Sequence, residues 1–95
     1  MANYMARVEL HAATWNDYDT LHVTMQRRGY SRVVQGDDGN WYQLPTGTYI
    51  VKNTNSSLQD ARGAAFAAAN ETGKQSSVIV ADWNGASWVG LPLVT

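Results

Sequence analysis

The stretch MARVELHAATWNDYDTLHVTMQRRG, residues 5–29, holds two different hydrophobic periods in succession. Over residues 5–12 the apolar and polar side chains alternate, and this period of two predicts a strand with one solvent-exposed face. Thr14 followed three positions later by Asp17 resembles a capping box, and apolar residues then recur at helical spacing until Gly29. A strand that leads into a capped helix of about three turns predicts an α+β chain.

Two further strands are predicted in the middle of the chain. Residues 30–35 (YSRVVQ) and 48–54 (TYIVKNT) are short and rich in β-branched side chains. The cluster GDDGN at residues 36–40 is typical of a reverse turn. The aromatic stretch GNWYQLPTGTYIV, residues 39–51, therefore joins or extends the two arms of a hairpin.

A second helix is predicted after the third strand. Ser57 with Asp60 repeats the capping pattern, and Gly73 ends the helical segment. The apolar stripe of this helix consists of Leu58, Ala61, Ala65, Phe66 and Ala69. Because the stripe is mostly alanine, the helix is expected to lie close against the surface it covers.

The end of the chain predicts a fourth strand at residues 76–83 (SSVIVADW). Asn84-Gly85 is suited to a two-residue type I′ turn, so residues 87–91 are expected to fold back beside that strand as a short C-terminal hairpin. The order β-α-β-β-α-β predicts a ferredoxin-like antiparallel sheet with both helices on one face. Residues 1–95 form one domain in this interpretation.

Composition excludes several classes of site. The chain has a net charge of −1 and a pI near 6.0, which argues against a domain that holds nucleic acid by many phosphate contacts and leaves small or transient RNA contacts open. It contains no cysteine, so disulfides, thiolate metal sites and cysteine nucleophiles are excluded. No long apolar run or secretory-type start is present, and a cytoplasmic protein without membrane association is expected.

A ferredoxin-like sheet leaves one face uncovered. In this chain that face would carry Arg7, Glu9 and His11, together with some of the hairpin aromatics. Exposed aromatic rings on an open sheet suit base stacking and a second protein subunit equally well. A homodimer formed through the open face or the sheet edge is therefore an alternative to RNA binding.

The rings of the stretch 39–51 either pack or bind a ligand. Leu44 is expected to pack inward, and Pro45 to keep the strand edge from pairing further. Trp41 and Tyr42 would close over the rim of the core. Tyr49 is the ring most readily assigned to a ligand, with burial in the core as the alternative.

Metal ligation is only weakly indicated. Asp37 and Asp38 lie in a turn of the kind that uses aspartate for backbone hydrogen bonds. Asp82 has no second carboxylate spaced with it, and Glu9 with His11 gives two ligands without a third. We predict no metal site and no cofactor.

Metal-independent RNA cleavage is compatible with the residue types present. The reaction needs a base for the ribose 2′-hydroxyl, an acid for the leaving oxygen, and a cation for the developing phosphorane charge. The candidates for base and acid are His22 or His11 and Tyr49. Arg27 or Arg28 would supply the cation.

Three local sequences resemble the GhoS-type family, the antitoxins of type V toxin-antitoxin pairs. They are DYDTLH at the opening of the first helix, GYSR entering the second strand and YQLPTGTY entering the third, within a framework that covers roughly residues 5–82. The resemblance implies a ferredoxin-like fold. It also implies an endoribonuclease that cuts the single-stranded messenger RNA of a membrane-damaging toxin.

The resemblance also implies site residues. Tyr49 stands where the family has a functional aromatic residue, and His22 stands where its first helix has a functional arginine. An arginine holds phosphate through two hydrogen bonds at any pH, whereas a histidine of ordinary pKa is mostly neutral at pH 7. The predicted catalytic residues are His22, Arg28 and Tyr49. The predicted RNA-binding residues are Arg27, Arg32 and His11.

Two other functions stay open. A non-catalytic protein-binding module, such as a mobile-element or phage-type inhibitor or a dimeric adaptor, fits the mild acidity, the few charges and the four tryptophans. A small-molecule-sensing regulatory domain has only the fold in its favour, and a fold does not determine function.

Overall fold

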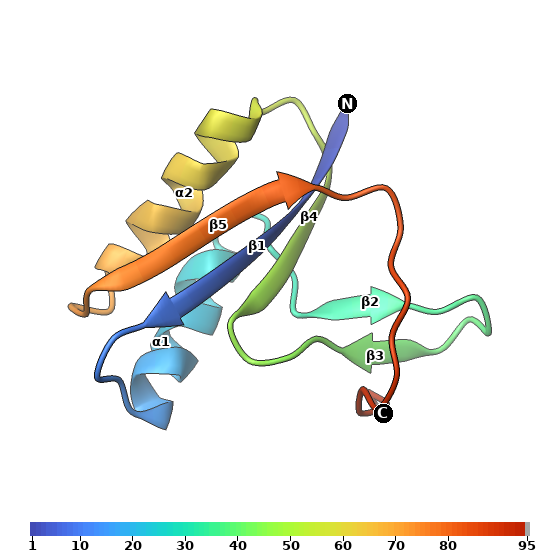
Figure 1. The fold of residues 1–95 in the computed structure, drawn as a ribbon, viewed down its shortest axis with the longest axis horizontal. Coiled ribbons are helices and arrows are strands. Elements are labelled where there is room, and N and C mark those ends of the chain that lie inside the picture. The colour runs from blue at the N-terminus through green and yellow to red at the C-terminus, as the bar shows by residue number, and fades with distance from the viewer. Residues whose placement is uncertain (95) are drawn as a thin grey trace.

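A computed structural model describes residues 1–94 and is drawn in Figure 1. It has two helices and a mainly antiparallel sheet, so the predicted α+β class is confirmed. The elements in chain order are β1 (Ala2–Leu10), α1 (Trp15–Gln26), β2 (Val33–Gln35), β3 (Trp41–Gln43), β4 (Thr48–Thr54), α2 (Leu58–Asn70) and β5 (Ser76–Asp82).

Strand β1 is the centre of the main sheet. It pairs antiparallel with β4 on one side and β5 on the other, in the order β4-β1-β5. Its alternating side chains separate as predicted: Ala6 and Val8 are buried, whereas Arg7 and Glu9 are exposed. Strand β1 begins earlier and ends earlier than predicted, and His11 lies in the turn that follows it.

Both helices contribute to the core on the inward face of β1 (Figure 1). The predicted capping box is present at α1, where the Thr14 side chain accepts from the Asp17 N–H and the Asp17 carboxylate accepts from the Thr14 N–H. Leu21 and Met25 of α1 are fully buried in this core. The capping residues therefore start the helix where its apolar side chains face the sheet.

Helix α2 lies close to α1, as its alanine content predicts. The Thr24 hydroxyl of α1 reaches the Ala68 carbonyl oxygen of α2 at 3.0 Å. The buried stripe consists of Ala61, Ala65, Ala68 and Ala69. Phe66 is 50% exposed, so its predicted place in the stripe is wrong: with Ala65, Ala68 and Ala69 facing the sheet, position 66 lies on the outer flank of the helix.

The predicted second strand, residues 30–35, does not join the main sheet along its length. Ser31 makes one isolated bridge to Ile50 of β4, and β2 then pairs with β3 as a separate two-stranded sheet. Val34 and Leu44 of these segments are buried with Ile50 in a second apolar cluster. Burial of these side chains over β4 explains why the chain leaves the main sheet.

The predicted C-terminal hairpin is wrong. After Trp83 the chain leaves β5 and runs beside β3, where the Val94 N–H donates to the Trp41 carbonyl at 2.8 Å. Trp83, Trp88 and Leu91 pack against the second apolar cluster. Partial burial of two indoles outweighs the local preference of Asn84-Gly85 for a tight turn.

Among residues 1–94, no helix has the length and apolar character needed to cross a membrane.

Candidate functional site

The candidate site begins with a contact between His22 of α1 and Tyr49 of β4. Nδ1 of His22 lies 2.6 Å from the Tyr49 hydroxyl, and the two ring centroids are 5.8 Å apart. Tyr49 points inward from β4 and is fully buried, whereas Ile50 beside it faces the second apolar cluster. His22 follows the buried Leu21 in α1, and this position puts the imidazole at the edge of the core.

Burial determines the direction of the His22–Tyr49 hydrogen bond. The Tyr49 hydroxyl has no other hydrogen-bond partner within residues 1–94. A buried hydroxyl that does not donate leaves its proton unsatisfied, so the Tyr49 O–H donates to Nδ1 of His22. The neutral imidazole then carries its proton on Nε2.

Both groups are neutral near pH 7. Burial lowers the pKa of His22, the Arg32 guanidinium lowers it further, and Asp19 opposes these effects. Burial raises the pKa of Tyr49, against the opposing effect of Arg32. His22 therefore presents a neutral N–H donor, and Tyr49 is a phenol rather than a phenolate.

A pocket of about 500 Å³ opens beside this pair, and we call it the His22 pocket. It lies between the end of α1 and the chain entering β2, and it is lined by His22, Gln26, Gly29, Tyr30, Ser31, Arg32 and Val33. The lining contains one cation, Arg32, and no carboxylate. A neutral N–H donor beside a guanidinium suits an anionic ligand.

The other predicted site residues lie elsewhere. Arg28 forms an ion pair with Glu71 at 2.6 Å and donates to the Thr24 carbonyl at 3.1 Å, so it connects α1 to α2. Arg27 is exposed at the C-terminal end of α1 and does not line the His22 pocket. His11 is exposed after β1, where Nε2 lies 2.9 Å from the Ser77 hydroxyl. Of the predicted set, the structure brings together His22, Tyr49 and Arg32.

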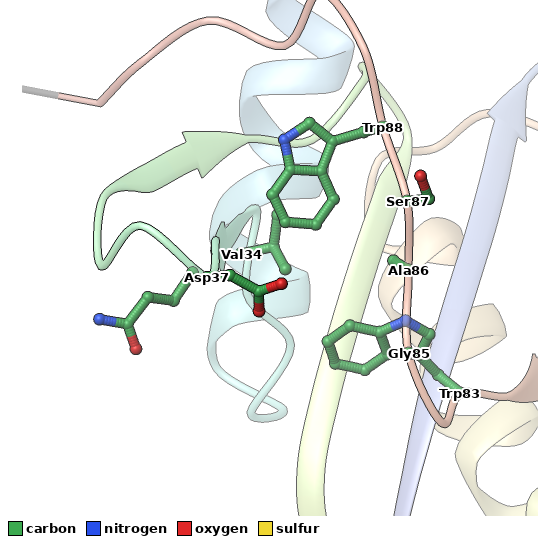
Figure 2. A pocket seen from close by; sticks show the side chains of 8 residues that line it. Val34, Asp37, Trp83, Gly85, Ala86, Ser87 and Trp88 are labelled. Atoms are coloured by element: carbon green, nitrogen blue, oxygen red, sulfur yellow. The ribbon is translucent and has the colours of Figure 1, made fainter.

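One aromatic site was not predicted from the sequence. Trp83 and Trp88 line a second pocket together with Asp37 (Figure 2). The sequence offered no signal for it, because the tail was expected to fold back beside β5. Within residues 1–94, no group of three potential metal-ligating side chains is present.

Comparison with protein-family models, with curated proteins and with solved structures finds no match to this chain. The proposed function therefore rests on the geometry of the His22 pocket and on the resemblance of three local sequences to the GhoS-type family.

Proposed function

We propose that this protein is a GhoS-like antitoxin that binds single-stranded RNA at the His22 pocket. The observation that carries the proposal is the shared pocket of His22 and Arg32. The outward Nε2–H of His22 and the Arg32 guanidinium are both donors, and phosphate oxygens are acceptors. Gln26 and Ser31 add polar groups to the same lining.

The strand arrangement supports the ferredoxin-like fold that this family implies. In the unit β4-α2-β5, strand β1 lies between the two parallel strands, as a split β-α-β unit requires. In the unit formed by β1, α1 and the segment at Ser31, strand β4 takes the intermediate place through the Ser31–Ile50 bridge. We propose that this sheet is a ferredoxin-like sheet whose second strand is reduced to one bridge.

The geometry favours RNA binding over RNA cleavage. A general base needs an unprotonated nitrogen facing the substrate, and His22 uses its unprotonated Nδ1 to accept from Tyr49. The opposite tautomer would leave the buried Tyr49 hydroxyl without an acceptor. Tyr49 acts through His22 in this proposal, as a positioning residue that holds the Nε2–H outward.

The proposal is tested by titrating labelled single-stranded RNA with purified protein at several salt concentrations. Arg32→Ala is expected to weaken binding and to reduce the salt slope by about 1, since one phosphate contact is lost. Arg62→Ala, at an exposed position of α2, is the matched control and is expected to leave binding unchanged. Equal RNA affinity in the wild type and Arg32→Ala would contradict the assignment of this pocket.

The variant Arg28→Ala tests whether RNA binds at the His22 pocket or at the predicted catalytic set that includes Arg28. Because Arg28 pairs with Glu71, we expect its loss to change RNA affinity less than the loss of Arg32. The same RNA incubated with each variant in the presence of EDTA is examined for fragments. Cleavage that survives EDTA and disappears in His22→Gln would contradict the binding-only role and establish a nuclease.

A further inference from the structure

The pocket between the C-terminal tail and the β2–β3 turn is separate from the His22 pocket. It has a volume of about 380 Å³ and is lined by Val34, Gln35, Asp37, Trp83, Gly85, Ala86, Ser87 and Trp88 (Figure 2). Val33 lines the His22 pocket, whereas Val34 and Gln35 line this one. We call this second site the indole pocket.

The two indoles that line the indole pocket are packed in different ways. Trp88 packs against Tyr42 of β3, with ring centroids 5.6 Å apart at an interplanar angle of 54°. Trp83 is half-buried, and its Nε1 is covered without a hydrogen-bond partner among residues 1–94, so no hydrogen bond of the indole N–H holds this ring. The two indoles approach the pocket from the same tail segment (Figure 2).

Asp37 supplies the charge of the indole pocket. Its neighbour Asp38 accepts from the Tyr42 hydroxyl at 2.5 Å and from the Asn40 N–H at 2.9 Å, which fixes the turn. The Asp37 carboxylate points toward the space between the two indoles (Figure 2). Asp37 is the one charged group among the lining residues, and the nearby cation Lys52 lies outside the lining, over the Trp83 ring.

Two indoles and a carboxylate together fit a planar organic cation. Indole rings attract cations through their faces, and Lys52 Nζ already lies 4.9 Å from the centroid of Trp83. A guanidinium can stack on an indole while its in-plane N–H groups donate to a carboxylate. A nucleobase would also stack, but its phosphates would meet the negative charges of Asp37 and Asp38.

We propose that the indole pocket binds the guanidinium group of an arginine side chain presented by a partner polypeptide. Residues 85–87 of the rim are exposed, so a side chain projecting from another surface can enter. This site is independent of RNA binding at the His22 pocket, and either proposal can fail without the other.

The test follows the four tryptophan indole N–H signals by NMR during titration with N-acetyl-arginine amide. N-acetyl-citrulline amide has nearly the same shape without the charge and is the matched probe. We expect the arginine probe to shift the Trp83 and Trp88 signals saturably, with Trp15 and Trp41 as internal references. Equal responses to the two probes would overturn the proposal.

A variant tests the carboxylate separately from the packing. Asp37 is exposed, so Asp37→Asn leaves the apolar contacts in place, and we expect it to weaken arginine binding about two- to fivefold. Asp60→Asn, at another exposed aspartate, is the control and should leave binding unchanged. Unchanged affinity of Asp37→Asn for the arginine probe would overturn the assignment. The assignment would also be overturned if guanosine monophosphate shifted the indole N–H signals of Trp83 and Trp88 and the arginine probe did not.

Discussion

The fully buried hydroxyl of Tyr49 lies 2.6 Å from Nδ1 of the half-buried His22, and this contact connects the core to the candidate site. The Tyr49 O–H is satisfied only by donating to Nδ1, so one hydrogen bond determines that the neutral imidazole carries its proton on Nε2. The protonation of His22 therefore depends on Tyr49, which does not itself line the pocket.

Replacing His22 by Gln is expected to change the pH dependence of stability. Because the pKa of His22 is lowered in the folded chain from its ordinary value of 6.5, the unfolded chain binds more protons just below that pH. The wild type should lose stability as the pH falls below 6.5, and His22→Gln should lose less. Urea unfolding between pH 5 and pH 8 measures the unfolding free energy of both proteins, with His11→Gln as the control. The same pH dependence in His22→Gln and the wild type would refute this prediction.

Tyr49→Phe is expected to cost about 0.5–1.5 kcal/mol of unfolding free energy, since one buried hydrogen bond is lost and the ring stays. It should also raise the pKa of His22, because the donor that favours neutral Nδ1 is removed. An NMR titration of the His22 ring protons tests this shift. Tyr49→Ala is not a useful site variant, since emptying a fully buried position costs about 3–5 kcal/mol.

Ala65→Leu is expected to destabilise the fold by about 1–3 kcal/mol, because Ala65 is fully buried where α2 lies close to the sheet. Phe66→Ala, at the next position, should cost less than about 1 kcal/mol, since half of that side chain is exposed. Thermal and urea unfolding of both variants measure the contrast. A larger loss of unfolding free energy in Phe66→Ala than in Ala65→Leu would mean that α2 is rotated about its axis relative to the orientation described above.

Gly47→Ala and Gly39→Ala separate a steric clash from backbone strain. Both glycines have a positive φ, 83° and 84°, which costs an alanine about 1 kcal/mol. A Cβ at Gly47 would lie 2.4 Å from the Val8 carbonyl oxygen, whereas a Cβ at Gly39 meets nothing within 4 Å. Gly47 also accepts from the Val8 N–H at 2.7 Å, so Gly47→Ala should cost about 2–4 kcal/mol. Equal unfolding free energies for the two variants would argue against this close approach.

Local signals in the sequence predicted the elements that depend on local interactions. The alternation in β1, the capping box of Thr14 and Asp17 and the close approach of the alanine-rich α2 are confirmed. Each depends on residues a few positions apart along one element. Phe66 is the exception within α2. Alanines occur on several sides of this helix, so the sequence pattern does not define a single buried face.

The candidate site was predictable only as a set of residue types. Tyr49 and His22 were named from the sequence, but Arg28 was predicted as the catalytic cation and Arg32 only as an RNA-binding residue beside Arg27. The structure places Arg32 in the His22 pocket and pairs Arg28 with Glu71. Which arginine faces His22 depends on where the chain turns after α1, and spacing along the helix does not contain that information.

The amino-acid pattern alone determined the class, the two helices and the inward face of β1, because hydrophobic period and capping act over a few residues. The tertiary structure decided that the second predicted strand keeps one bridge to β4 and that Trp83 and Trp88 leave the expected hairpin for a second apolar cluster. The physical reason is the same in both cases. Burial of apolar side chains against partners distant in sequence outweighs local turn and strand preferences, and those partners exist only once the chain is folded.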